Sequence, residues 1–227
     1  MEAHLILGKE KMIEKSYYNP TVADPVIPLI EAARARLLKN EKLVRDIPGT
    51  PGPFDDQPIE KAARGSKNKE NCLHLYLMAK ENATGGVVEL GTNLGISSAY
   101  LAAGARTASP TSTVVTGDCS GKRLAIAQSL HRECGLSNLS YVEGFFDVTA
   151  QKIFDLVPSW TLAFIDGDHT FTGTMKYYSI AKRTARPGCV VIFDDIEWSE
   201  EMREAWTAIR ILHQHTQEIG GMGYLKL

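Results

Sequence analysis

Two short apolar segments of the chain each end in residues that could bind a cation or move a proton. Leu162–Ile165 is followed by Asp166, Asp168 and His169, and Val190–Phe193 is followed by Asp194 and Asp195. Segments of this length, rich in β-branched and aromatic residues, predict buried strands. In a parallel α/β sheet the ligand crevice lies beyond the carboxyl ends of the strands, so these carboxylates are expected to converge. Because several buried like charges are costly unless a cation neutralises them, the pattern predicts a metal site with a histidine beside it.

Each of these residues also has a structural interpretation. Asp166 alone would most often cap the following helix, and Asp194 with Asp195 could be a solvated loop. The strand-end geometry of the three acids together favours metal binding. His169 could remove a proton from a substrate oxygen, or it could be an ordinary surface histidine. Asp168 could orient that histidine or cap the next helix.

The composition excludes several classes of protein. The chain has 227 residues, 44% of them hydrophobic and 23% charged, as expected for one globular domain with an elaboration. A net charge of −2 gives no electrostatic case for a nucleic-acid partner. Four scattered cysteines without a Cys-x-x-Cys pair are typical of a reduced, cytoplasmic protein. The sequence shows neither a signal peptide nor an apolar run long enough to span a membrane, so we expect a cytoplasmic protein without membrane contact.

Strand and helix patterns alternate over most of the chain. An N-terminal helix is expected within residues 25–45, a loop at 47–54 and a helix at 72–83. Strands are then expected at 87–90, 113–116, 139–142, 162–165 and 190–193, helices at 96–105, 122–134, 149–156, 172–185 and 200–213, and two short strands within 216–227. This order predicts an α/β fold with a Rossmann-like, doubly wound, mostly parallel sheet, an antiparallel C-terminal strand and an N-terminal helical extension. We place the extension at residues 1–68 and the main domain at 69–227.

A glycine-containing loop joins the first strand of the main domain to its helix. Gly91 and Gly95 would let the backbone approach a ligand closely, and the helix N-terminus adds free N–H groups. Their spacing differs from the Gly-x-Gly-x-x-Gly of dinucleotide enzymes and from the P-loop. The second strand ends in Asp118, which could bind both hydroxyls of a ribose or cap the next helix. The loop and the acid together favour a nucleoside ligand.

These motifs together resemble class I S-adenosylmethionine-dependent methyltransferases. The shared pattern is Glu-Leu-Gly-x-x-x-Gly-x-Ser, an acid after the second strand, Asp166 before a basic residue at i+3, and an acidic pair after the fifth strand. The chain is most similar to the metal-dependent O-methyltransferases of the catechol, caffeoyl-CoA and macrolide-sugar types. The resemblance extends from about Lys69 to the C-terminus, and N-terminal helices commonly cover the site in that family.

The resemblance implies which residues surround the cofactor and the metal. The residues near S-adenosylmethionine would be Glu89, Gly91, Thr92, Asn93, Gly95, Ser97, Asp118, Asp147 and Asp166. Asp166, Asp194 and Asp195 would hold Mg²⁺ or a similar divalent cation, which hard oxygen ligands select over zinc. Catechol-type enzymes have an asparagine and a lysine where this chain has Asp195 and His169, whereas the macrolide-sugar branch uses a histidine at the latter position.

The activity that the resemblance implies is O-methylation of a hydroxyl on a small molecule such as a natural product, a sugar or a phenol. The ion would bind the acceptor hydroxyl, and His169 with Asp166 would be the catalytic residues. A metal-independent N- or O-methyltransferase of the same fold, a nicotinamide-dependent oxidoreductase and a non-catalytic binding protein remain alternatives. The oligomeric state is open, and a homodimer paired through the N-terminal helices is one arrangement.

A few aromatic and apolar residues have weaker interpretations. Trp198 could wall the substrate pocket. Helical spacing predicts that Met202, Trp206, Ile209 and Leu212 belong to the core. Tyr17, Tyr18 and Phe54 could form a lid, with surface packing as the alternative.

Overall fold

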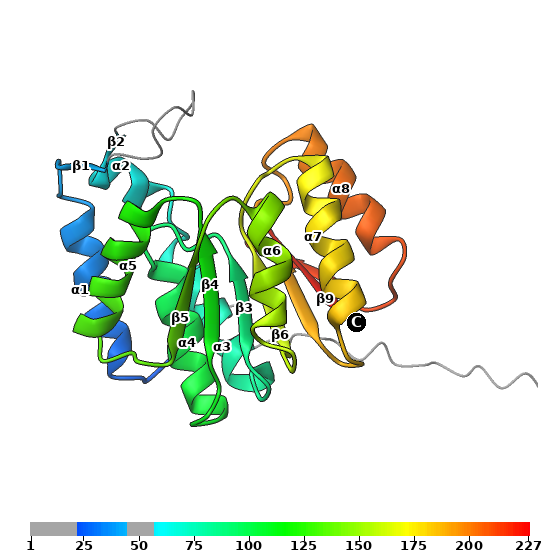
Figure 1. Cartoon of the computed structure of the whole chain (residues 1–227), viewed down its shortest axis with the longest axis horizontal. Helices are drawn as coiled ribbons and strands as arrows, with labels where there is room; N and C mark the ends of the chain where they lie inside the picture. Colours follow the sequence, from blue (N-terminus) through cyan, green and yellow to red (C-terminus); the bar gives the residue numbers. More distant parts are fainter. Residues whose placement is uncertain (1–21, 45–56) are drawn as a thin grey trace, which may run out of the picture.

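The computed structural model describes residues 22–44 and 57–227. Its main feature is a seven-stranded sheet with the order β5-β4-β3-β6-β7-β9-β8, of which Figure 1 labels β5, β4, β3, β6 and β9 from left to right. The strands are β3 (Val87–Leu90), β4 (Val114–Asp118), β5 (Leu139–Glu143), β6 (Leu162–Ile165), β7 (Val190–Phe193), β8 (Thr216–Ile219) and β9 (Met222–Lys226). Strands β3 to β7 run parallel, and β9 is antiparallel to both of its neighbours. This confirms the predicted doubly wound sheet with its antiparallel C-terminal strand.

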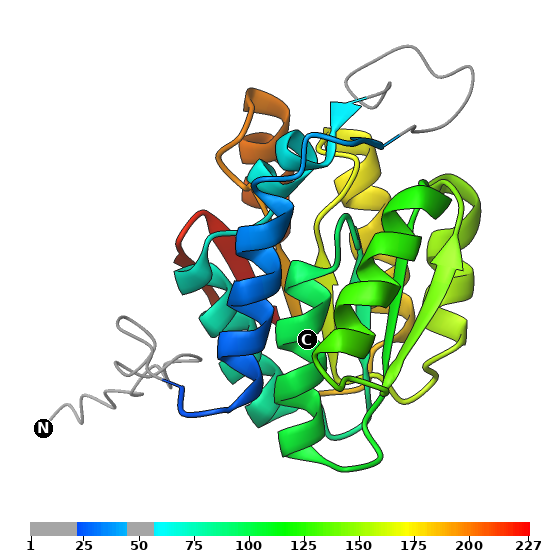
Figure 2. The ribbon, with the colours of Figure 1, turned by 90° about the vertical axis from the view of Figure 1, so that its left-hand side faces the viewer.

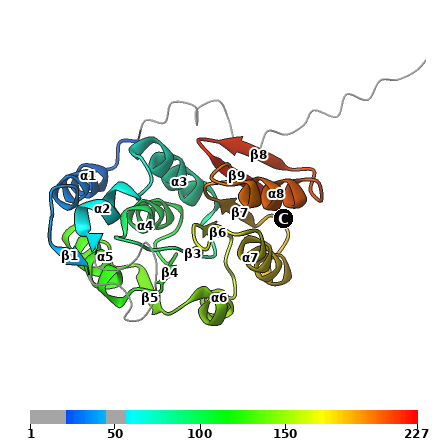
Figure 3. The ribbon, with the colours of Figure 1, turned by 90° about the horizontal axis from the view of Figure 1, so that it is seen from above.

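Helices cover both faces of the sheet, as the view from above shows (Figure 3). One face carries α1 (Val26–Leu37), α3 (Lys69–Asn82), α4 (Ile96–Ala108) and α5 (Gly121–Glu133), and the other carries α6 (Phe146–Asp155), α7 (Phe171–Thr184) and α8 (Glu200–Arg210). The predicted N-terminal helical extension is present as α1 and the short α2 (Ile59–Arg64), joined by the strand pair β1 (Leu43–Val44) and β2 (Gln57–Pro58). Figure 2 shows α1, in blue, on the outside of its layer, partly covering α3 and next to α4.

The central strands β3, β6 and β7 are buried on both faces because each side of the sheet packs under its own helices. In β7, Val190 and Ile192 join the hydrophobic cluster on the α4 side, whereas Val191 and Phe193 join the cluster on the α7 side. This alternation follows the two-residue period of a strand. A parallel strand covered on both faces favours apolar residues at every position, which is why β6 and β7 are continuous apolar runs in the sequence.

Several helix boundaries differ from those expected, among them the end of the first helix and the start of the helix expected at 72–83. The first helix ends at Leu37, well before Arg45, because the chain turns there and the Asn40 side chain accepts a hydrogen bond from a backbone N–H two residues later. The helix expected at 72–83 begins at Lys69, because the side chain of Asn68 accepts a backbone N–H of the first turn and caps it.

The core prediction for α8 is correct for three of its four residues. Met202, Trp206 and Ile209 are buried, but Leu212 is 60% exposed. The prediction for Leu212 is wrong because α8 ends at Arg210, so the helical periodicity that would have buried a later residue stops.

Some expectations fall outside the described residues. These are the loop at 47–54 and the lid residues Tyr17, Tyr18 and Phe54. The domain boundary after residue 68 falls directly before α3 and stays a prediction. Within the described residues, no helix is both long enough and apolar enough to cross a membrane.

Candidate active site

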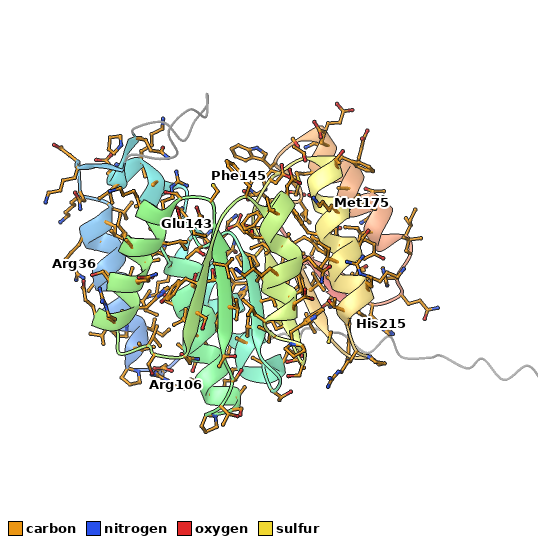
Figure 4. The ribbon with its side chains drawn as sticks, in the orientation of Figure 1. Arg36, Arg106, Glu143, Phe145, Met175 and His215 are labelled. Carbon is orange, nitrogen blue, oxygen red and sulfur yellow. The ribbon has the colours of Figure 1, made fainter. Side chains whose placement is uncertain are left out.

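The carboxyl ends of the parallel strands share one edge of the sheet, at the top of Figure 1. Figure 4 marks this edge with Glu143, the last residue of β5, and with Phe145, while Arg106 near the far end of α4 lies at the opposite edge. The loops after β3, β4, β6 and β7 therefore leave the sheet side by side, as the topology predicts for a ligand crevice.

The acids of the β6 and β7 loops converge with the histidine between them. His169 Nε2 lies 3.6 Å from Asp166 Oδ1 and 3.8 Å from Asp195 Oδ2. Ligand atoms of these three residues all lie within 4.8 Å of one another, close enough to hold a metal ion. Asp194 lies deeper, 1% exposed, and its Oδ1 has no hydrogen-bond partner among the described residues. Of the five residues that the sequence singled out at these strand ends, the structure thus brings together Asp166, His169, Asp194 and Asp195. We call Asp166, Asp194 and Asp195 the acid cluster.

A lysine that the sequence analysis missed lies inside the acid cluster. Lys67 Nζ is 2.7 Å from Asp194 Oδ2 and 2.6 Å from Asp195 Oδ1. Its side chain is only 14% exposed, and it comes from the turn directly before α3, 128 residues away from Asp195 in the chain. Its ammonium group therefore supplies part of the positive charge that the three acids require.

Burial and mutual repulsion govern the protonation of the cluster. Burial and the charge of Asp194 raise the pKa of Asp166 well above its ordinary value, against the opposing effect of Lys67. Burial likewise raises the pKa of Asp194. Burial acts to lower the pKa of Lys67, but the charge of Asp194 and hydrogen bonds to Asp194 and Asp195 outweigh it and raise that pKa. The two carboxylates therefore favour the charged, ammonium form of Lys67.

Asp168 has neither of the roles considered from the sequence. Its Oδ2 accepts a hydrogen bond from the Tyr177 hydroxyl at 3.0 Å, and its Oδ1 accepts one from Thr170 at 3.3 Å. The helix cap is Thr170, whose side chain accepts the Gly173 N–H. Asp168 thus braces the β6 loop against α7 and does not orient His169.

The glycine loop and the acid cluster are in direct backbone contact. Gly91 has φ +115°, and a Cβ atom there would lie 1.9 Å from the backbone oxygen of Asp166. Gly95, at the start of α4, has φ +86°, and its Cβ would lie 2.7 Å from Nε2 of His131. Both positions require glycine for its positive φ and for the space that a side chain would fill.

Asp118 ties the glycine loop to the end of β4. Its Oδ2 accepts the backbone N–H of Asn93 at 2.8 Å, and its Oδ1 accepts that of Ser120 at 2.9 Å. The cap of α5 is Ser120, which accepts the Arg123 N–H, so Asp118 is not the helix cap. Its carboxylate instead lies against the loop predicted to hold a nucleoside.

Two buried acceptor atoms beside this loop have no hydrogen-bond partner among the described residues. Glu89 is fully buried; its Oε2 accepts hydrogen bonds from the hydroxyls of Ser98 and Thr116, whereas its Oε1 is unpartnered. Burial raises the pKa of this carboxyl. Asn93 donates to the Ala62 carbonyl, and its Oδ1 is likewise unpartnered. Buried acceptors are rarely left unsatisfied, so both suit donors on a ligand.

The remaining predicted cofactor residues lie in different surroundings. The Thr92 hydroxyl is 2.5 Å from that of Thr116, beneath the loop, and Ser97 is buried in the first turn of α4. Asp147 lies at the surface of α6, where its carboxylate is paired with Lys176 at 2.7 Å. Its placement near the adenine stays a prediction.

Trp198, expected to wall the substrate pocket, projects from the loop after β7 with most of its surface exposed. Its backbone N–H donates to the Asp195 carbonyl at 2.9 Å, so it belongs to the turn that carries the acidic pair. Its position at the edge of the acid cluster is compatible with the predicted role.

His131 supports the glycine loop from below and was missed by the sequence analysis. Its Nε2 lies 2.7 Å from the Gly95 carbonyl, and its Nδ1 lies 2.7 Å from the Tyr141 hydroxyl. Because a carbonyl can only accept, Nε2 carries the proton and Tyr141 donates to Nδ1. Burial lowers the pKa of His131 to about 4. A histidine in the last turn of a helix gives no sequence signal of such a role.

This buried histidine should make the stability of the protein fall in mild acid. The unfolded chain takes up the proton near the ordinary pKa of 6.5, and the folded chain only near 4, so stability falls as the pH drops through that window. The full loss at this site is about 3 kcal/mol. Urea unfolding of the wild type and of His131→Gln between pH 7 and pH 4.5 should show a flatter pH dependence for the variant. Parallel curves for the two proteins would contradict the assignment.

Comparisons with known proteins agree with this arrangement. Residues 88–196 match a family model described as a methyltransferase domain. The chain matches none of the curated protein sequences with which it was compared. A cofactor-bound structure of Rv0187 from MTB is 20% identical, with a TM-score of 0.64 over 93% of this chain and 94% of that one.

Two solved O-methyltransferases are similar over almost their full length. One, from Bacillus cereus in complex with S-adenosylhomocysteine, is 16% identical, with a TM-score of 0.64 over 93% of this chain and 95% of that one. The other, TomG from Streptomyces achromogenes in complex with S-adenosylmethionine, is involved in tomaymycin synthesis. It is 16% identical, with a TM-score of 0.64 over 92% of both chains. At these identities the likeness shows the fold, and it bears out the resemblance inferred from the motifs.

Proposed function

We propose that this chain, which has the fold of class I S-adenosylmethionine-dependent methyltransferases and a methyltransferase domain over residues 88–196, methylates a hydroxyl group of a small molecule. The observation that carries the proposal is the contact between the glycine loop and the acid cluster, at Gly91 and the backbone of Asp166. A methyl donor on the loop would lie directly beside an acceptor held at the cluster, as direct transfer requires.

The residues around the loop fit S-adenosylmethionine. The cofactor carries an ammonium group and two ribose hydroxyls, which are hydrogen-bond donors. The unpartnered acceptors Glu89 Oε1 and Asn93 Oδ1 and the carboxylate of Asp118 offer complementary groups. The O-methyltransferases from Bacillus cereus and Streptomyces achromogenes were solved with S-adenosylhomocysteine and S-adenosylmethionine, respectively.

The acid cluster fits a divalent cation such as Mg²⁺. Asp166, Asp194 and Asp195 are the proposed ligands, supported by the unpartnered Oδ1 of Asp194 and by the raised pKa of Asp166. When bound, such an ion would position the acceptor hydroxyl and make it more acidic. His169 also lies within ligand distance of Asp166 and Asp195, so it is either a further ligand or the base.

As the base, His169 would move one proton. Its Nε2 would take the proton of the acceptor hydroxyl while the new carbon–oxygen bond forms and the methyl–sulfur bond breaks, which releases S-adenosylhomocysteine. Asp166 and Asp195, whose oxygens lie 3.6 and 3.8 Å from Nε2, would balance the resulting positive charge.

A second candidate function is favoured by the position of Lys67. Its ammonium already bridges Asp194 and Asp195, so the site could be partly neutralised without a metal. In that case the chain would be a metal-independent N- or O-methyltransferase that binds its acceptor against the acids.

Removing divalent ions should separate the two candidates. With a panel of phenols and sugars as acceptors, we expect EDTA to lower the rate of S-adenosylhomocysteine formation by about a hundredfold and Mg²⁺ to restore it. Calorimetric titration with S-adenosylhomocysteine and with NAD is the control, and only the former should bind, whether or not EDTA is present. Turnover unaffected by EDTA would favour the metal-independent candidate, and binding of NAD alone would contradict both.

A further inference from the structure

The backbone of Lys67 is held in place by hydrogen bonds on both sides of the residue. The guanidinium of Arg34, on α1, donates a hydrogen bond to the Lys67 carbonyl. Arg34 is itself held by Glu31 at 3.0 Å and by Cys72 Sγ at 3.3 Å. On the other side, Asn68 is the cap of α3. The lysine is thus placed by the contacts of Arg34, on α1, with Lys67 and with the first turn of α3.

The position of the Lys67 side chain follows from this placement of its backbone. It is mostly buried and ends between Asp194 and Asp195, whereas Lys69, two residues later, is exposed at the start of α3. A buried lysine is rare unless it is paired, and here it makes two short contacts with carboxylates. Its ammonium group is therefore a buried, paired component of the acid cluster and not a surface charge.

A metal ion bound by both Asp194 and Asp195 would compete with the Lys67 ammonium for the same position. A Mg²⁺ ion binds carboxylate oxygens at about 2.0–2.1 Å. An ion bound to Asp194 Oδ2 and Asp195 Oδ1 would therefore overlap the Lys67 ammonium, which contacts both oxygens. With Lys67 in place, the ligand atoms that remain are those of Asp166, His169 and Asp195 Oδ2, together with the unpartnered Oδ1 of Asp194.

We propose that Lys67 is a tethered cation that competes with divalent metal ions for Asp194 and Asp195 and so limits how tightly the acid cluster binds metal. The inference rests on the proposed function only in that a metal is bound at this site. Repulsion between the ammonium and an ion at the remaining ligands weakens metal binding further, because two cations a few ångströms apart in a buried site repel strongly. The N-terminal extension, through Arg34 and Lys67, therefore sets the metal affinity of the main domain.

The test compares Mn²⁺ binding to the wild type, to Lys67→Met and to Lys69→Met by calorimetry. We expect Lys67→Met to bind Mn²⁺ at least tenfold more tightly than the wild type, because the competing charge is gone, and Lys69→Met to bind it like the wild type. Affinity in Lys67→Met that equals or falls below that of the wild type would overturn the proposal. So would a wild-type Kd for Mn²⁺ below about 1 µM.

Thermal unfolding provides a second readout. In EDTA, Lys67→Met leaves three carboxylates without a counter-ion and should melt below the wild type, and Mn²⁺ should raise its Tm more than that of the wild type. An equal rise in both proteins would overturn the proposal. Lys67→Arg, which keeps the charge, should bind Mn²⁺ as weakly as the wild type. Titration of each protein with S-adenosylhomocysteine tests the proposed function separately, since its failure in the wild type would leave the metal affinities unaffected.

Discussion

Asp166→Asn is expected to lower the rate of methyl transfer by about a thousandfold while leaving the fold intact. Asparagine keeps the size of the side chain but removes the negative charge that faces His169 at 3.6 Å and that a cation at the cluster requires. The backbone contact with the glycine loop is unchanged, so the affinity for S-adenosylhomocysteine should fall far less than the rate does. The measurement is the initial rate of S-adenosylhomocysteine formation, with calorimetry for binding.

Asp168→Asn is the matched control because it makes the same substitution in the same loop. The φ of Asp168 is +54°, a conformation that asparagine adopts readily. Its carboxylate contacts Tyr177 and Thr170 rather than the cluster, so we expect turnover within about threefold of the wild type and a loss of about 1 kcal/mol in stability. If the two variants lost activity equally, the acid cluster would not be the acceptor site.

The sequence predicts the sheet well because its central strands obey a simple physical rule. Strands β3, β6 and β7 are buried at every position, and β6 and β7 are also apolar at every position. So short a segment that is wholly apolar indicates a buried element, and in β3 only Glu89 departs from this pattern. Helix ends are harder to predict because several side chains compete to cap them. Asp118 and Ser120 were both available at α5, as were Asp168 and Thr170 at α7, and only the structure shows that the hydroxyls are the caps.

The candidate site is predictable only where the topology brings its residues together. Asp166, Asp194 and Asp195 follow neighbouring parallel strands, so their convergence needs no knowledge of packing. Lys67 reaches them across 128 residues of chain, and nothing in the sequence distinguishes it from Lys69. Its place depends on how α1 packs against the main domain, which periodicity does not determine.

Backbone strain points to the same edge of the sheet independently of the side-chain chemistry. Among the described non-glycine residues, positive φ occurs at Asn93, Asp168 and Asp195, with values of 45°, 54° and 50°. Each lies in the loop after a different parallel strand, β3, β6 or β7. Such residues cost about 1 kcal/mol or more each and cluster at functional sites, where the surrounding packing holds them. The strain therefore supports a ligand site at this edge.

Gly91→Ala is expected to abolish binding of S-adenosylhomocysteine and to destabilise the protein by about 3 kcal/mol or more. The added Cβ would lie 1.9 Å from the backbone oxygen of Asp166 and 2.8 Å from its carbonyl carbon. Both are backbone atoms at the end of β6, so they cannot move aside as the tip of a flexible side chain could. The loop and the strand end must separate, which displaces the proposed cofactor loop and the acid cluster together. Calorimetry and urea unfolding measure the two effects.

Gly188→Ala is the control that separates the steric overlap at Gly91 from the strain of a positive φ. Gly188 has φ +92°, but a Cβ there meets nothing within 4 Å among the described residues, so alanine should cost only about 1 kcal/mol and leave binding of S-adenosylhomocysteine unchanged. The difference between the two variants then measures the close contact between Gly91 and Asp166. If Gly91→Ala bound S-adenosylhomocysteine as tightly as Gly188→Ala, the glycine loop would not be the cofactor site. The proposed donor and acceptor sites would then no longer be neighbours, and the acid cluster alone would have to account for the activity.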